Sequence, residues 1–217
     1  MGSPTSNTDQ LIDRLAADVS PVRRLVDPRR RAARWAAFAL AIAAIGVVYY
    51  GLRRDLGTAL SAGPILLRLP LLAATMWLAA IAALRVSVPG AGARAWTRWW
   101  PLLLLGALVA ITAAELVLAG DTRTPMRGWA CVRKMTFVGL VPAFGALVLV
   151  YRAAPLEPIW AAVLALVAAG AAGALTSELA CPLGSPMHVL LWHVLPIAVY
   201  AGLGAAAIAV GLRLRRR

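Results

Sequence analysis

The sequence predicts an all-α integral membrane protein: a bundle of six transmembrane helices with a short cytoplasmic amphipathic segment at its N-terminus. The composition is the first reason. Hydrophobic residues make up 61% of the 217 residues, charged residues only 14%, and the mean hydropathy is +0.78, whereas an ordinary soluble domain carries about 25% charged residues. A soluble fold of this length cannot bury so much apolar surface. The apolar segments must therefore face lipid or one another.

The second reason is the spacing of the apolar segments. A helix needs about 20 mostly apolar residues to cross the hydrocarbon of a bilayer. Six segments meet this condition, at residues 32–51, 64–85, 101–119, 135–151, 158–175 and 186–212. Asp27–Pro28 and Ser185–Pro186 each have the pattern of a helix cap followed by the first helical residue. We therefore expect an N-terminal segment of residues 1–31, a six-helix domain of residues 32–212 and a basic tail of residues 213–217.

The distribution of basic residues predicts the orientation, because cytoplasmic loops are enriched in Lys and Arg. The chain has 22 Lys and Arg, 9 Asp and Glu, and a net charge of +13. With a cytoplasmic N-terminus, the outer side holds only seven basic residues: Arg53, Arg54, Arg68, Arg123, Arg127, Arg133 and Lys134. The remaining fifteen then lie inside. We therefore expect both termini in the cytoplasm, with the charge serving as a sidedness signal and no direct contact with nucleic acid.

The N-terminal segment has the pattern of an amphipathic helix. Leu11, Ile12, Leu15 and Val19 recur at helical spacing on one face, and charged residues occupy the other. A segment this short cannot build its own core, so we favour an apolar face that binds in the groove of a partner protein. Membrane lipid is the alternative partner of the segment. The arginines at 29–31 and at 34 are expected to contact anionic lipid headgroups.

The two cysteines are expected on the same outer face. Cys131 and Cys181 lie in connections between spans, and His188 and His193 follow in the sixth span. Thiolates with imidazole suit a soft metal ion such as Cu(I), with Zn or Cd as other candidates at Cys131 and Cys181. A disulfide and free thiols are the other states that the sequence allows. Cys131, Cys181, His188 and His193 are therefore the candidate sensor residues. Because residues five apart on one α-helix point in rather different directions, a two-thiolate site completed by one imidazole is one arrangement that the sequence allows.

Three ionisable residues are predicted within the spans, where such groups usually face the interior and are paired. Arg68 and Glu115 lie near the outer ends of the second and third spans, which allows a structural ion pair between them. His193 lies deeper, and Glu115 or a backbone carbonyl is its expected partner. The sequence contains no catalytic Ser/His/Asp grouping, phosphate-binding Gly-rich loop or HExxH motif. We therefore expect a protein that is not an enzyme.

Several short stretches resemble, in order, the NrsF-type family of six-span membrane anti-sigma factors. They are Leu15–Leu25 (LAADVSPVRRL), Arg85–Gly90 (RVSVPG), Cys131 with Arg133, Arg152–Leu156 (RAAPL), Cys181–Pro182 and Leu191–Pro196 (LWHVLP). Together they extend over most of the chain.

The resemblance implies that the N-terminal segment sequesters an extracytoplasmic-function sigma factor at the inner membrane. The residues expected to bind this partner are Leu11, Ile12, Leu15, Val19, Pro21, Val22, Arg23, Arg24 and Leu25. It also implies that Cys131 and Cys181 sense a metal or oxidative stress that frees the sigma factor. The alternative from the residues is a small transporter or metal-handling membrane protein with the outer cysteines as its substrate site. A scaffold subunit of a larger membrane complex is a third interpretation.

Overall fold

The computed structural model describes residues 7–18, 25–61, 63–88, 95–120 and 128–214, and every regular element in these ranges is a helix. Six helices are long and apolar enough to cross a membrane, which confirms the predicted fold class. The first five are α2 (Pro28–Tyr50), α4 (Pro64–Val86), α5 (Ala95–Ala119), α6 (Trp129–Tyr151) and α7 (Pro158–Ala180). The sixth consists of α8 (Pro186–Val189), the π-helical segment η1 (Leu190–Val194) and α9 (Leu195–Leu214). Two short helices are α1 (Asn7–Ala17) and α3 (Leu56–Ser61).

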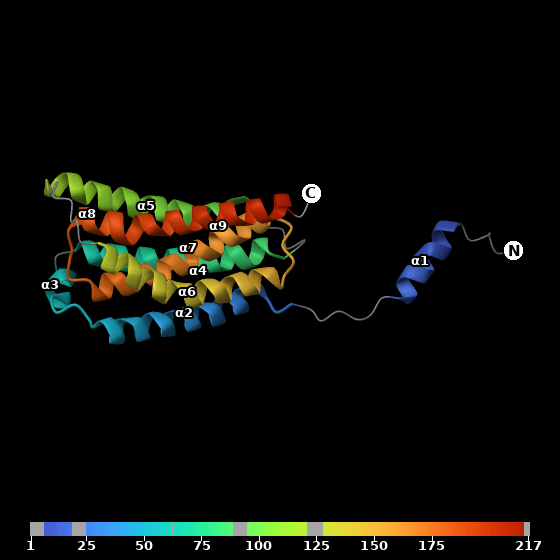
Figure 1. The fold of residues 1–217 in the computed structure, drawn as a ribbon, viewed down its shortest axis with the longest axis horizontal. Coiled ribbons are helices and arrows are strands. Elements are labelled where there is room, and N and C mark those ends of the chain that lie inside the picture. Colours follow the sequence, from blue (N-terminus) through green and yellow to red (C-terminus); the bar gives the residue numbers. More distant parts are fainter. Residues whose placement is uncertain (1–6, 19–24, 62, 89–94, 121–127, 215–217) are drawn as a thin grey trace.

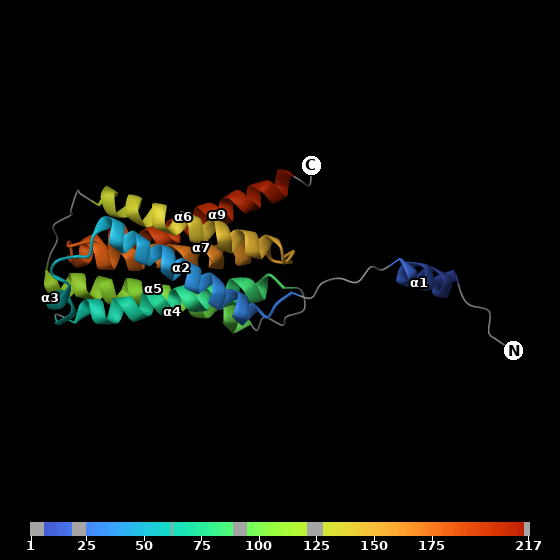
Figure 2. The same cartoon turned by 90° about the horizontal axis from the view of Figure 1, so that it is seen from below.

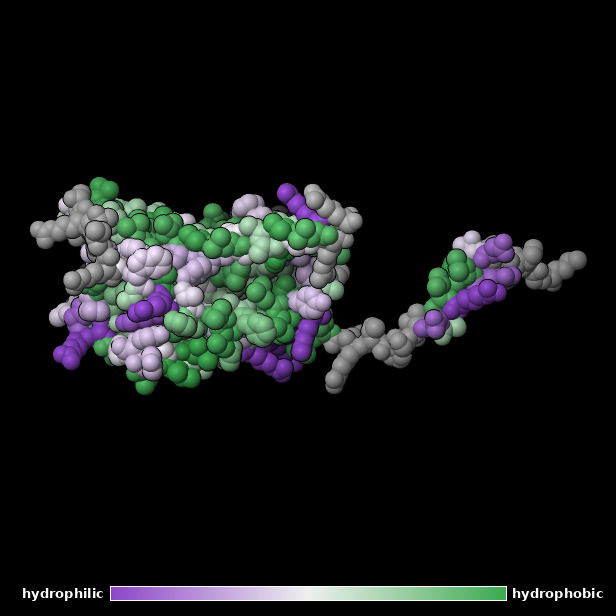
Figure 3. Space-filling view, in the orientation of Figure 1, coloured by the Kyte–Doolittle hydropathy of each residue, from purple (hydrophilic) through white to green (hydrophobic). Residues whose placement is uncertain are grey.

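The six long helices run alternately up and down, so the bundle has two distinct ends (Figure 1). The start of α2 and the end of α9 lie at one end, which we call the terminal end. The start of α6 and the end of α7 lie at the other, the cysteine end. The space-filling view shows a largely apolar face between hydrophilic groups at the two ends (Figure 3). The first and last residues of the six-helix domain thus lie on the same side of the bundle, as two cytoplasmic termini require.

Helix α7 forms the centre of the bundle, as the view from below also shows (Figure 2). Within its apolar span 78% of the residues are buried, against 17–44% in the other five spans. Its small residues allow this. A Cβ added to Gly173 would lie 2.6 Å from the carbonyl oxygen of Met135, and one added to Gly139 would lie 3.3 Å from that of Ala169. Small residues on both helices, Gly173 in α7 and Gly139 in α6, therefore permit close backbone approach between them.

The first span begins four residues earlier than the apolar window indicates. Asp27 caps α2, accepting from the backbone N–H of Arg29 at 2.8 Å and of Arg30 at 3.3 Å, with Pro28 at the first position, as expected. Arg31 falls in the first turn and is buried, and its guanidinium donates to the Leu149 carbonyl at 2.6 Å. The expected headgroup contact is therefore wrong for Arg31, because this side chain satisfies a carbonyl near the end of α6.

Two other helices extend past the apolar windows and carry site residues with them. Helix α6 begins at Trp129, so Cys131 lies in its first turn rather than in a connection. Helix α7 continues to Ala180, which places Glu178 inside the helix. An apolar segment ends at the first polar residues, whereas the helix continues through them as long as its backbone N–H and C=O groups stay paired. The Cys131 sulfur and the Glu178 carboxylate are thus held on helices, which are more rigid than loops.

The amphipathic helix predicted at the N-terminus is present as α1, and none of its residues is buried. Leu11, Ile12 and Leu15 expose 56%, 56% and 62% of their surface, and Figure 3 shows apolar and charged groups on separate sides of this helix. Leu25 is also exposed. The other residues expected to bind a partner, Val19, Pro21, Val22, Arg23 and Arg24, lie outside the described residues.

Candidate functional site

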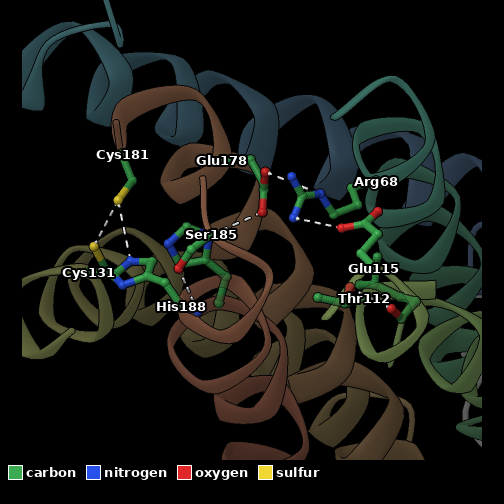
Figure 4. Close-up of polar contacts among 10 residues, drawn as sticks. Arg68, Thr112, Glu115, Cys131, Glu178, Cys181, Ser185 and His188 are labelled. Carbon is green, nitrogen blue, oxygen red and sulfur yellow. Dashed lines mark hydrogen bonds and ion pairs between the residues drawn. The ribbon is translucent and has the colours of Figure 1, made fainter. Parts of the chain in front are cut away.

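Four potential metal ligands meet at the cysteine end, and Figure 4 labels three of them, Cys131, Cys181 and His188. The ligand atoms of Cys131, Cys181, His188 and His193 all lie within 4.8 Å of one another. All four residues are at most 5% exposed. Cys131 comes from the first turn of α6, Cys181 follows the last residue of α7, and the two histidines come from α8 and η1. The fold thus brings together, on three chain segments, the residues that the sequence singled out.

The π-helical segment η1 explains why both histidines reach the site. In a regular α-helix residues five apart are separated by roughly 140° around the axis, so two imidazoles at this spacing would point in different directions. In η1 the backbone N–H of Leu195 instead donates to the carbonyl of Leu190, five residues earlier. His188 and His193 therefore face each other edge-on, with ring centroids 5.2 Å apart. Both candidate histidines thus reach the thiols, because a π-bulge, a feature often found at functional sites, changes the register.

The two cysteines are free thiols in contact with each other. Their sulfurs lie 3.2 Å apart, and Nε2 of His188 lies 3.4 Å from Cys181 Sγ. A hydrogen bond from the Cys131 thiol lowers the pKa of Cys181, and one from His188 acts in the same direction against the opposing effect of burial. Cys181 is therefore favoured as a thiolate, the form that binds metal and reacts with oxidants.

Glu178 is the partner of His193. Its Oε1 atom lies 3.1 Å from His193 Nδ1, and both side chains are 2% exposed. The expectation of Glu115 or a backbone carbonyl is wrong, because the last turn of α7 places Glu178 directly against the histidine. A sequence signal existed: Glu178 precedes Cys181 by three residues, so the two share one helical face.

Arg68 and Glu115 form the expected ion pair, with Arg68 Nη1 3.5 Å from Glu115 Oε2. The guanidinium is shared, because Arg68 Nε also lies 3.8 Å from Glu178 Oε2. Figure 4 shows Glu178, Arg68 and Glu115 in a row, with the Arg68 guanidinium between the two carboxylates. Arg68 and Glu115 also line a cavity of about 650 Å³ that Arg53 and Asp55 border. The ion pair is thus connected to the site through one carboxylate.

Arg53 is also buried, and it stabilises the connections around the site. The Arg53 guanidinium donates to both carboxylate oxygens of Asp55, at 2.8 and 2.7 Å, and this hydrogen bonding holds the pKa of Asp55 below its ordinary value. Its backbone N–H donates to the Leu179 carbonyl at 2.9 Å. The connection after α2 is therefore bound to the last turn of α7, two residues before Cys181.

The arrangement suits a closed metal site. Two thiolates and two imidazoles form the ligand set of many four-coordinate zinc sites, and all four groups here are buried. The same sulfurs are near enough to be joined by an oxidant after a small movement, since a disulfide requires about 2.05 Å. The fold and site therefore define a multi-pass membrane protein with a buried thiol–imidazole cluster at one end and an exposed amphipathic helix beyond the other.

Comparison with known proteins identifies the family within this class. The chain belongs to the NrsF family, described as negative regulator of sigma F, whose sequence model matches residues 15–214. It is thus a member of a family of negative regulators of a sigma factor. A similar curated protein is the carotenogenesis protein CarR of Myxococcus xanthus, 38% identical over 137 residues, which are 61% of this chain and 58% of the relative. No solved structure matches the chain.

Proposed function

We propose that the protein is an inner-membrane anti-sigma factor that holds an extracytoplasmic-function sigma factor through its N-terminal segment. The sigma factor would be released when the cluster at the cysteine end binds a soft metal ion, or when an oxidant joins the two sulfurs in a disulfide. The observation that carries the sensor is the meeting of Cys131, Cys181, His188 and His193 within 4.8 Å, fully buried. Family membership supports the regulatory role.

The partner-binding part of the proposal rests on α1. Its apolar side chains Leu11, Ile12 and Leu15 are each more than half exposed, and α1 buries none of its own residues. An unpartnered amphipathic helix is suited to the groove of a folded partner. The arginine distribution supports a cytoplasmic position for the terminal end, where a sigma factor is found.

Signal transfer would run along the bundle. Joining the sulfurs, or coordinating both, ties the start of α6 to the end of α7 at the cysteine end. Oxidation of two thiols to a disulfide releases two protons and two electrons to the oxidant, whereas metal binding displaces protons only. Rigid helices would carry the displacement to the terminal end. A coupling of about 1–3 kcal/mol between sites, or 5–150-fold in affinity, is sufficient for a switch of this kind.

The partner claim is tested by co-purification of the sigma factor from membranes. A chain lacking residues 2–25 keeps the Asp27 cap and the buried Arg31, so it should insert normally. It should fail to retain the sigma factor, and replacing Leu11, Ile12 and Leu15 by Ala should do the same. Asp13→Ala, on the charged face of α1, is the matched control. Full retention of the sigma factor by the shortened chain would refute this part of the proposal.

The sensor claim is tested with the protein–sigma complex in liposomes. Cd²⁺ added on the outside should release the sigma factor from the wild-type complex but not from Cys131→Ser or Cys181→Ser. Met187→Leu, which changes a nearby thioether outside the ligand set, is the control. Unchanged release from both cysteine variants would exclude the cluster as the sensor. Metal flux into liposomes containing the protein alone would instead favour the metal-handling alternative.

A further inference from the structure

Glu178 is a fully buried carboxylate that makes contact with a candidate ligand without belonging to the ligand set. It is 2% exposed and lies in the last turn of α7. We infer that Glu178 is a positioning residue that presents Nε2 of His193 to a divalent metal ion in a Cys131/Cys181/His188/His193 site. The inference rests on the proposed function, because it assumes that the cluster binds metal.

The proton on His193 has a defined place. An ionised carboxylate can only accept hydrogen bonds, so at 3.1 Å from Glu178 Oε1 the Nδ1 atom of His193 carries the hydrogen. In the neutral ring Nε2 then has a free lone pair. This atom is buried and makes no hydrogen bond of ordinary geometry among the described residues, and the His193 side chain also interacts with the Cys181 sulfur. A buried lone pair without an ordinary hydrogen bond, within the 4.8 Å cluster, is what a metal ligand requires.

The carboxylate has the partners that a buried charge needs. An unpaired carboxylate in this environment would be strongly destabilising. Arg68 Nε lies 3.8 Å from Glu178 Oε2, and Arg68 Nη1 lies 3.5 Å from Glu115 Oε2. Arg68 itself is 3% exposed. One oxygen of Glu178 thus faces the histidine and the other faces the arginine, which keeps the carboxylate out of the ligand set and fixes its orientation.

The ligand class follows from this division of roles. Two sulfurs and two imidazole nitrogens, all buried, favour a four-coordinate Zn²⁺ or Cd²⁺ without an open coordination position. A carboxylate that accepts from the second nitrogen of a ligating imidazole raises the basicity of the ligand, and losing it typically costs 10–100-fold in metal affinity. Glu115 is the matched control, because it is an acid of the same charge network that does not contact a histidine.

The test measures metal affinity of the full-length protein in detergent micelles. Cd²⁺ is titrated against a competing chelator, and tetrahedral Co²⁺ is followed by its visible spectrum. We expect Glu178→Ala to weaken Cd²⁺ binding 10–100-fold while the cadmium–thiolate charge-transfer band is retained. Glu178→Gln keeps the shape and the acceptor oxygen, so it should fold, retain the tetrahedral Co²⁺ spectrum and lose less affinity. Glu115→Gln should bind as wild type.

A double-mutant cycle separates positioning from a general structural effect. If Glu178 acts through His193, then Glu178→Ala should cause no further loss of affinity in a His193→Ala background. Additive losses, or wild-type affinity in both folded Glu178 variants, would overturn the inference. The cycle is independent of sigma-factor release. If the Cys131 and Cys181 variants bind Cd²⁺ as tightly as wild type, metal sensing itself is refuted. If they lose Cd²⁺ affinity but the Glu178 variants do not, only the positioning role is refuted.

Discussion

Replacing Gly173 by Ala tests whether α6 and α7 approach each other as closely as the structure indicates. The new Cβ would lie 2.6 Å from the backbone oxygen of Met135 and 2.9 Å from its Cγ. Ordinary van der Waals contact begins at 3.4 Å, so the backbone of α6 must retreat by about 0.8 Å. A carbonyl within a helix cannot rotate away as the end of a flexible side chain can. The strain must therefore be taken up by separation of the two helices.

The size of the effect follows from two opposing contributions. Ala is favoured over Gly in a helix interior by about 1 kcal/mol, whereas overpacking of a tight core costs about 1–3 kcal/mol. Gly106 in α5 is the matched control, because a Cβ there meets nothing within 4 Å among the described atoms. Both variants gain the same helix propensity. Gly173→Ala should therefore be less stable than Gly106→Ala by about 1–3 kcal/mol.

Equilibrium unfolding in mixed micelles, followed by circular dichroism, measures this difference directly. Met135 lies one turn after Cys131, so the retreat of α6 should also weaken Cd²⁺ binding at the cysteine end. Equal stabilities of the two variants would refute the close approach. So would a Gly173→Ala protein that gains stability as Gly106→Ala does.

Three further predictions follow from contacts outside this crossing. The pKa of Cys181 is held below its ordinary value of 9.0, so its thiolate contributes folding stability that is complete above pH 9 and is lost as the pH falls. The difference in unfolding free energy between wild type and Cys181→Ser should therefore shrink on acidification from pH 9. A difference that does not change with pH would contradict this. Asp27→Ala removes the cap of α2 and should cost about 1 kcal/mol in the same unfolding assay, with Asp13→Ala as a neutral control. Trp35→Phe removes the 2.9 Å hydrogen bond to the Pro142 carbonyl and should cost about 1–2 kcal/mol; full stability of this variant would argue against the bond.

Much of the fold could be predicted from local composition. Six apolar windows fixed the number of spans, because crossing a bilayer sets a minimum helix length that few soluble elements reach. The Asp27–Pro28 and Ser185–Pro186 pairs marked two helix starts, since capping depends on adjacent residues. The starts of α2 and α6 and the end of α7 were less predictable. They depend on long-range partners such as the Leu149 carbonyl that accepts from Arg31.

The candidate site divides in the same way. The sequence alone determined that two cysteines would lie at the outer ends of the later spans, that two histidines would follow in the sixth span, and that Arg68 could pair with Glu115. Only the tertiary structure decided that both imidazoles reach the thiols and that Glu178, not Glu115, contacts His193. The reason is geometric: a π-bulge at Leu190–Val194 changes the angular spacing of residues five apart, and the ends of α6 and α7 are placed by packing across the bundle. Local sequence patterns contain neither the position of the π-bulge nor the placement of these helix ends.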